Sequence, residues 1–271
     1  MNKRKKRWIW LKLLLIIVVL IAIGFINPLK LTKYDIYSST LPEEFDGYRI
    51  VQITDFHCKE FGDKEANLIE LVKKADPDLI VLTGDIVDEV HTVENADYLL
   101  VGLVRLAPVY YVTGNHEYYD GAPYDEFQEL CAEYGITILD NESRDITKNG
   151  ATIKISGLDW HSPEGHLRND LGYADANYYN ILLFHNAAKF DFLAEFGYDL
   201  IFTGHIHGGL VRIPFVGGVF SSEYTLFPKY DYGEFKDKAS TMVCSSGLGD
   251  ARIPRWNNPR EVVLVTLHVD D

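Results

Sequence analysis

Cysteine is scarce in this chain, which has three cysteines among its 271 residues. The three, Cys58, Cys131 and Cys244, are odd in number and far apart in the sequence. Disulfide-stabilised domains need paired cysteines, and thiolate metal sites need closely spaced ones. The sequence therefore argues against a disulfide framework, and any metal site is expected to use nitrogen and oxygen ligands.

Positive charge is scarce beyond the first twelve residues. The chain has 26 Lys/Arg and 40 Asp/Glu, and residues 1–12 hold six of the cations and none of the acids. The remainder therefore has 20 cations against 40 acids, a net charge of −20. Such a surface repels polyphosphate backbones, so nucleic acid is not expected as a partner. A bound metal ion would still attract an anionic substrate locally.

The longest hydrophobic run lies at the N-terminus. MNKRKKR carries five positive charges in seven residues, and the next 19 residues, WIWLKLLLIIVVLIAIGFI, are interrupted only by Lys12 and Gly24. This length suits a single-pass transmembrane helix, and the basic cluster before it favours a cytoplasmic N-terminus. Residues 1–30 are thus predicted to be a basic tip and membrane anchor, with residues 31–271 forming one domain on the extracytoplasmic side.

A cleaved signal peptide is the competing interpretation of this segment. Ala22-Ile23-Gly24 resembles the small-residue pattern at which such peptides are cut. The apolar run is longer than the core of a typical signal peptide, which favours an uncleaved anchor.

The remaining sequence alternates short apolar runs with longer amphipathic stretches, a pattern typical of an α/β domain. Buried strands are predicted at residues 48–54, 78–83, 109–113, 180–184 and 199–203, and helices at 64–75, 93–106, 124–135 and 187–197. Further strands at 136–140, 151–157, 240–246 and 261–269 suggest a second, partly antiparallel layer. Residues 208–238, rich in glycine, proline and aromatics, are expected to be a long irregular excursion.

Each of the five buried strands ends in residues that bind metals or transfer protons. These endings are Asp55-Phe-His57, Gly84-Asp85, Gly114-Asn115-His116-Glu117, His185 and Gly204-His205-Ile206-His207. In an open α/β sheet, sites form outside the carboxyl ends of the strands, so the five endings should converge. Residues i and i+2 of an extended chain point to the same side, which would pair the two members of D-x-H and of H-x-H.

The number and type of these donors predict a metal site with two ions. Two aspartates, one asparagine and four histidines besides His116 exceed what one tetrahedral zinc can use. Asp85, central and single, suits a carboxylate that bridges two ions. Two ions about 3.5–4 Å apart can clamp the attacking and leaving oxygens of a phosphoryl group and lower the pKa of a bridging water. The expected chemistry is hydrolysis of a phosphate ester.

Five motifs in this order resemble those of the calcineurin-like metallophosphoesterases. They are D-x-H at 55–57, G-D-x-x-D at 84–88, G-N-H-E at 114–117, the isolated His185, and G-H-x-H-G-G at 204–209. The resemblance covers residues 48–269. The segments RIPFVGG, FPKYDYGEF, SSGLG and NPREVVLVTL further resemble a membrane-associated bacterial branch of that family.

The resemblance implies a four-layer α/β/β/α sandwich whose two central sheets carry a dinuclear centre at the strand ends. One metal would be held by Asp55, His57, Asp85 and His207, and the other by Asp85, Asn115, His185 and His205. His116 would act as the acid that stabilises the transition state or protonates the leaving oxygen. The metals would be Mn, Fe or Zn.

Two positions depart from the pattern of this branch. Ala187 stands where His-Asn is often followed by proline, and Leu210 stands where glutamine often follows G-H-x-H-G-G. Neither departure removes a ligand, but both would alter substrate contacts. Asp88 is expected to support its loop. A surface or packing role is the default expectation for Arg252, Arg255 and Arg260, and a contact with phosphate is the alternative.

The function predicted from these features is that of a membrane-anchored, dinuclear phosphoesterase. The location suggests phosphodiester or pyrophosphate bonds of a lipid-linked or cell-envelope substrate. A phosphomonoesterase acting on soluble or protein-bound phosphate, and a metal-retaining surface binding protein without turnover, are the alternatives. The sequence leaves open the natural substrate, the metal, the oligomeric state and the cleavage of the anchor.

Overall fold

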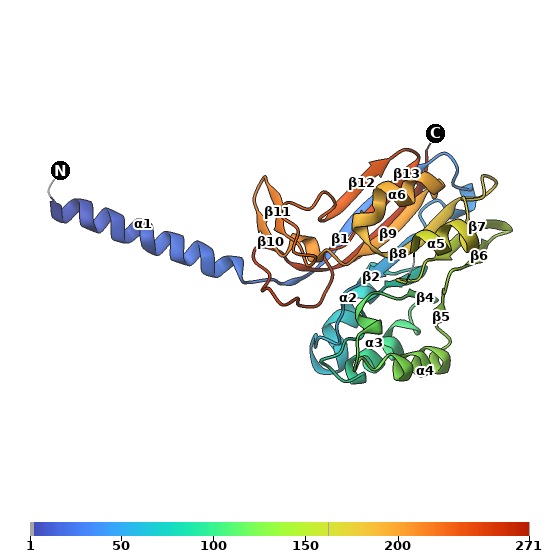
Figure 1. The fold of residues 1–271 in the computed structure, drawn as a ribbon, viewed down its shortest axis with the longest axis horizontal. Coiled ribbons are helices and arrows are strands. Elements are labelled where there is room, and N and C mark those ends of the chain that lie inside the picture. The colour runs from blue at the N-terminus through green and yellow to red at the C-terminus, as the bar shows by residue number, and fades with distance from the viewer. Residues whose placement is uncertain (1–2, 162, 271) are drawn as a thin grey trace.

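The computed structural model, which describes residues 3–161 and 163–270, contains two six-stranded sheets and a two-stranded hairpin (Figure 1). The first sheet has the order β1 (Leu29–Ser38), β14 (Arg260–Val269), β2 (Arg49–Ile53), β3 (Leu79–Thr83), β4 (Val109–Val112), β5 (Thr137–Ile138). The second has the order β12 (Gly233–Asp237), β13 (Ser240–Cys244), β9 (Leu200–Gly204), β8 (Asn180–Asn186), β7 (Ala151–Gly157), β6 (Glu142–Lys148). The hairpin pairs β10 (Val211–Ile213) with β11 (Gly217–Phe220).

The described helices are α1 (Lys3–Gly24), α2 (Ala66–Ala75), α3 (Glu94–Leu103), α4 (Tyr124–Tyr134), α5 (Pro163–His166) and α6 (Phe190–Leu193). The predicted helix at 187–197 is a succession of short turns around α6 rather than one continuous helix. A π-helical turn, Leu167–Leu171, follows α5.

Alternation of apolar residues along the strands builds four layers. In β3, Ile80 and Leu82 pack with the residues of α2, α3 and α4, whereas Val81 packs between the two sheets. In β8, Leu183 joins the core between the sheets and Leu182 packs outward with α6. Successive side chains of a strand point to opposite faces, so each sheet is covered on both sides. The predicted α/β/β/α sandwich is confirmed.

The distribution of strands between the sheets differs from the expectation. The segments predicted at 180–184 and 199–203 lie in the second sheet, whereas those at 136–140 and 261–269 lie in the first. The excursion expected to be irregular, 208–238, contains β10, β11 and β12. Pairing between distant strands is decided by tertiary contacts, which local hydrophobic periodicity does not record.

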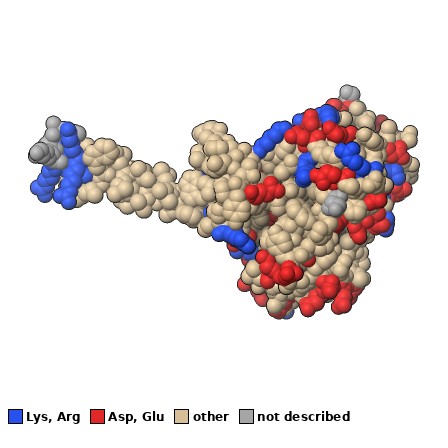
Figure 2. Space-filling model, in the orientation of Figure 1, with Lys and Arg blue, Asp and Glu red and all other residues tan. Residues whose placement is uncertain are grey.

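The N-terminal helix extends away from the body of the protein (Figure 1). Residues Arg4–Gly24 are long and apolar enough to cross a membrane, and almost all of their side chains are exposed. At about 1.5 Å per residue this helix is about 32 Å long, close to the thickness of a bilayer core. Figure 2 shows Lys and Arg gathered at its start and acidic side chains spread over the body.

Candidate metal centre

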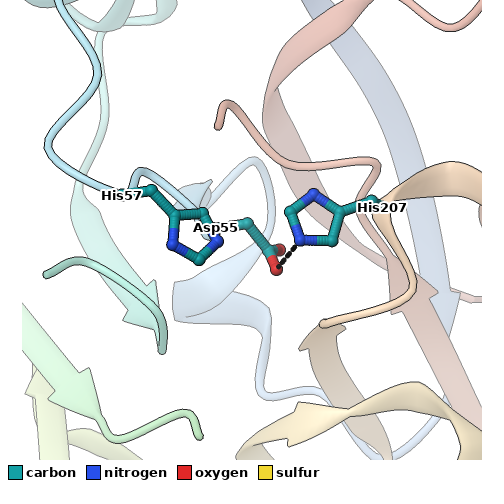
Figure 3. A group of neighbouring side chains, drawn as sticks. All are labelled: Asp55, His57 and His207. Atoms are coloured by element: carbon teal, nitrogen blue, oxygen red, sulfur yellow. Dashed lines mark ion pairs between the residues drawn. The ribbon is translucent and has the colours of Figure 1, made fainter. Parts of the chain in front are cut away.

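The ends of strands from both sheets bring the predicted ligands together. Three overlapping groups of donors form, and within each group the ligand atoms lie within 4.8 Å of one another. The groups are Asp55, His57 and His207; His57, Asp85 and His116; and Asp85, His185 and His205. Figure 3 shows the first group, in which the two histidine rings flank the carboxylate. Because His57 and Asp85 each belong to two groups, the three form one cluster.

Two buried carboxylates lie between the histidines. Oδ1 of Asp55 is 3.4 Å from Nε2 of His207 and 3.9 Å from Nε2 of His185. Oδ2 of Asp85 is 3.0 Å from Nε2 of His185. Burial disfavours ionisation of Asp85, but the neighbouring histidines hold the pKa of this carboxyl well below its usual range. The cluster therefore keeps negative charge where cations would bind.

Three of the predicted ligand atoms are buried and have no hydrogen-bond partner. They are Nε2 of His57, Nε2 of His185 and Oδ1 of Asn115; both histidine nitrogens lie near Oδ2 of Asp85, at 3.8 Å and 3.0 Å, but neither forms a hydrogen bond with it. Leaving a buried polar atom unpaired costs about 1–3 kcal/mol, so such atoms are rare unless they serve a ligand. Imidazole nitrogens with carboxylate and amide oxygens are a donor set for divalent metal ions. The residues present thus fit the metal that the sequence predicts.

In His185 and Asn115, the other polar atom of the side chain makes a hydrogen bond. Nδ1 of His185 is 2.6 Å from the carbonyl oxygen of Thr83, to which it donates, so Nε2 is the ring nitrogen that faces the cluster. Nδ2 of Asn115 donates to the hydroxyl of Tyr119 at 3.0 Å, which leaves Oδ1 directed elsewhere. Contacts of this kind fix the orientation of metal-binding side chains.

Acidic residues hold two further histidines. Oε1 of Glu223 lies 3.1 Å from Nε2 of His205, and Oδ2 of Asp88 lies 3.6 Å from Nδ1 of His57. Asp88 also supports its loop as expected, because its Oδ1 accepts backbone N–H bonds from Val90 at 3.0 Å and His91 at 2.9 Å. Glu223 belongs to the segment 208–238 and carried no predicted role, because nothing in the local sequence relates it to the first histidine of G-H-x-H.

Arg255 is buried against His207. One guanidinium nitrogen, Nη2, donates to the carbonyl oxygen of Ser246 at 2.7 Å and lies 3.1 Å from Nδ1 of His207. Burial and the positive charge of Arg255 hold the pKa of His207 well below its usual value, so the ring stays neutral. Neutral imidazole is the form that binds a metal. Of the two roles expected for Arg255, the structure supports packing.

The local backbone differs from the extended geometry expected for D-x-H and H-x-H. Five predicted ligands have positive φ angles: Asp55 (51°), His57 (50°), Asp85 (52°), His205 (70°) and His207 (49°). Non-glycine residues adopt this region infrequently, and such strain concentrates at functional sites. The side chains therefore converge through tight turns after the strands. The prediction that they converge by alternation along extended chain was wrong. His205 and His207 accordingly enter different groups.

Glu117 joins the loops that follow β3 and β4. Its buried carboxylate accepts backbone N–H bonds from Gly114 at 2.7 Å, Asp85 at 3.0 Å and Ile86 at 2.7 Å. These bonds fix the positions of Asp85 and Asn115 relative to each other. The G-N-H-E motif contains Glu117, but its spacing alone assigned this residue no function.

Five residues of the cluster, His57, Asp85, His116, His205 and His207, line a cleft of about 640 Å³. His116 lines this cleft and is partly exposed, and its Nδ1 is 2.8 Å from Oε2 of Glu89. Arg252 is the one Lys or Arg among the described lining residues. Leu210, one of the two departures noted above, also lines the cleft and is buried.

The family model described as calcineurin-like phosphoesterase matches residues 48–209, which include all the predicted ligands. This chain belongs to the calcineurin-like phosphoesterase family. It is 28% identical over 249 residues to YkuE, an uncharacterized metallophosphoesterase of Bacillus subtilis, with 88% of this chain and 85% of YkuE covered. An uncharacterized metallophosphoesterase of Aquifex aeolicus is 30% identical over 264 residues, with 88% of this chain and 92% of that protein covered.

Membership of the calcineurin-like phosphoesterase family makes this protein a metal-dependent hydrolase of phosphate esters. The predicted family, fold and enzyme class are therefore confirmed. The clustered histidine and carboxylate groups are suited to divalent metal ions.

Proposed function

We propose that this protein is a membrane-anchored phosphoesterase with two metal ions, acting on phosphodiester or pyrophosphate bonds of a lipid-linked or cell-envelope substrate. The observation that carries the proposal is the overlap of the donor groups, in which Asp85 is common to a group with His57 and a group with His185. A carboxylate with two oxygens suits this position between two ions.

The overlap supports the division of ligands that the family resemblance implies. Asp55, His57, Asp85 and His207 would hold one ion, and Asp85, Asn115, His185 and His205 would hold the other. The ions would be Mn, Fe or Zn, and when bound they would supply Lewis acidity toward the phosphate and acidify water.

The side chains of the cleft supply the remaining chemistry. Glu89 holds Nδ1 of His116, so Nε2 is the ring nitrogen that delivers a proton to the leaving oxygen. Glu117 keeps the loops that carry Asp85 and Asn115 in place while substrate binds. Arg252 attracts the phosphate into a cleft that is also lined by acidic residues.

The proposed location rests on the length and charge of the N-terminal segment. Helix α1 spans the cell membrane once, its basic start remains in the cytoplasm, and the catalytic domain of residues 31–271 lies on the extracytoplasmic side. An envelope phosphate is then the substrate class within reach of the cleft.

Metal-dependent hydrolysis by the full chain in detergent tests this function. The protein is stripped with a chelator, reloaded with Mn²⁺, and assayed on a chromogenic phosphodiester and a phosphomonoester in parallel. We expect metal to restore hydrolysis with preference for the diester, and His116→Ala to reduce kcat about 100-fold at unchanged metal content. Preference for the monoester would favour the phosphomonoesterase. A folded, metal-loaded chain without turnover on either ester would favour a binding protein.

A further inference from the structure

The segment that follows G-H-x-H-G-G carries an unusual concentration of exposed apolar side chains. Between residues 213 and 227 six large hydrophobic side chains are exposed, whereas the rest of the described chain after α1 and residues 25–26 exposes five. We name them the apolar patch: Ile213, Phe215, Val216, Tyr224, Leu226 and Phe227. Exposed clusters of this kind mark interaction sites in stable proteins.

The apolar patch belongs to one hydrogen-bonded unit. Phe215 and Val216 form the turn between β10 and β11, and β11 contacts the returning chain through a bridge between Phe220 and Leu226. The backbone N–H of Phe227 donates to the carbonyl oxygen of Val219 at 2.9 Å. The exposed side chains are thus presented by a folded surface.

This unit is fixed to the end of α1. The backbone N–H of Trp256 donates to the carbonyl oxygen of Leu210, just before β10. The N–H of Arg212 donates to the carbonyl oxygen of Trp256, and both distances are 3.0 Å. The indole Nε1 of Trp256 donates to the carbonyl oxygen of Ile21 in the last turn of α1 at 2.9 Å. Figure 1 shows the hairpin at the end of the body where α1 joins it.

Charge is sparse on this unit. Residues 213–228 contain one charged side chain, Glu223, which accepts a hydrogen bond from Asn186 at 2.9 Å and contacts His205 in the cleft. The region beside the end of α1 that projects from the body is uncharged in Figure 2. Most of the body is acidic and would be repelled by anionic lipids, so an uncharged apolar surface is where it can approach a bilayer.

We propose that the apolar patch inserts into the outer interface of the same bilayer that α1 spans, so that the cleft opens at the membrane surface. The inference rests on the proposed anchoring by α1. That anchoring places the last turn of α1, and with it Trp256, at the boundary between lipid and water, where Trp and Tyr are favoured. Ser222, Glu223 and Tyr224 of the same segment line the cleft. The substrate is then a phosphate ester carried by an amphiphile in the bilayer.

Depth-dependent quenching in vesicles tests the insertion. All three native cysteines are buried, so a cysteine introduced at an exposed position takes up an environment-sensitive fluorophore selectively. The full chain is reconstituted in phosphatidylcholine–phosphatidylglycerol vesicles containing brominated lipids, with Phe215→Cys as the probe. Leu15→Cys in α1 reports the anchoring itself, and Tyr173→Cys, also exposed but stacked on Phe196, is the aqueous control.

We expect lipid to quench the Phe215→Cys label at least threefold more than the Tyr173→Cys label. Quenching at Leu15 without quenching at Phe215 would overturn the insertion while leaving the anchor in place. If the unlabelled Phe215→Cys chain instead forms a disulfide-linked dimer in the same vesicles, a second copy of the chain covers the apolar patch and the insertion is equally wrong.

Hydrolysis by the double variant Phe215→Asp and Phe227→Asp tests the consequence for substrate access. We expect about a tenfold loss on a long-chain alkyl p-nitrophenyl phosphodiester in vesicles, with hydrolysis of a soluble diester within twofold of the unsubstituted chain. Equal rates on the vesicle-borne ester would overturn the proposed access. Failure of the unsubstituted chain on both esters would instead contradict the proposed function, and the quenching result would still decide the insertion.

Discussion

Glu89 and His116 form a close contact at the cleft, with Oε2 of Glu89 2.8 Å from Nδ1 of His116. The backbone N–H of His116 also donates to Oδ1 of Asp85, again at 2.8 Å. His116 is therefore oriented from two sides, by a carboxylate on its ring and by a predicted metal ligand on its backbone. Glu89 thereby fixes the ring orientation and leaves Nε2 of His116 free for the proposed acid role.

Glu89→Gln should lower kcat about tenfold while leaving metal content unchanged, because a neutral amide holds the ring of His116 in place less firmly than a carboxylate does. Turnover and its pH profile are measured beside metal analysis. Glu94→Gln is the matched control. It alters a carboxylate that lies away from the cleft and accepts a hydrogen bond from the hydroxyl of Tyr98 at 2.9 Å. An unchanged pH profile and kcat would remove Glu89 from the proposed mechanism.

Asp85→Asn should release bound metal and reduce turnover by more than about 100-fold, because the shared carboxylate loses its charge. Elemental analysis gives the number of ions per chain, and the diester assay gives the activity. Asp46→Asn changes an exposed carboxylate near His268, 3.3 Å from its Nδ1, and should retain both properties. Full metal content in Asp85→Asn would contradict the assignment of this residue as the bridge.

Arg252→Gln should raise KM for a phosphodiester about threefold to tenfold, with little change in kcat, because it removes an attractive charge from the cleft. Steady-state kinetics at fixed ionic strength separates the two constants. Arg144→Gln removes a guanidinium paired with Glu142 on the second sheet and should leave KM unchanged. Equal KM values for both variants would restrict Arg252 to a surface role.

Gly204→Ala should destabilise the fold and disturb the metal centre. A Cβ at this position would lie 2.2 Å from Oγ1 of Thr54 and 2.5 Å from Oδ2 of Asp55. Overpacking of this kind costs about 1–3 kcal/mol or more. Thermal unfolding of the metal-free chain should show a lower Tm, whereas Gly165→Ala, with open space around its Cβ, should not. Equal Tm values for Gly204→Ala and Gly165→Ala would show that the strand ends can shift to accommodate the added methyl group.

Glu65→Gln should stabilise the protein above neutral pH. Burial raises the pKa of Glu65 from 4.5 to about 7. Between these values the unfolded chain has released this proton while the folded chain retains it, so folding stability falls as pH rises from 4.5 to 7. At pH 8 the variant should gain about 1–3 kcal/mol in the free energy of unfolding, and little at pH 4.5. Denaturant unfolding at both pH values measures this, and equal gains would contradict the pKa shift.

The convergence of the candidate ligands was predictable because most of them directly follow strands. Asp55, Asp85, Asn115 and the paired histidines of G-H-x-H all follow short apolar runs, and strand ends of an α/β fold meet at common edges. The sheet to which each strand belongs was not predictable. β8 and β14 have similar apolar sequences, yet one pairs in the second sheet and the other in the first.

The residues that orient the ligands were also beyond the sequence pattern. The carbonyl of Thr83 meets His185 across 102 positions of sequence, and the guanidinium of Arg255 meets His207 across 48. Neither contact leaves a periodic or local signal, because each exists only after the strands have paired.

The sequence by itself determined the kinds of ligand, their order, the membrane-length helix and the α/β class, since these depend on residue chemistry and on periods of a few residues. Tertiary structure decided the left-handed turns that aim the candidate ligands, the contacts that orient them, and the placement of the apolar patch beside α1. The contacts and the placement of the patch join residues distant in the chain, and the strained turns persist because packing of both assembled sheets holds them.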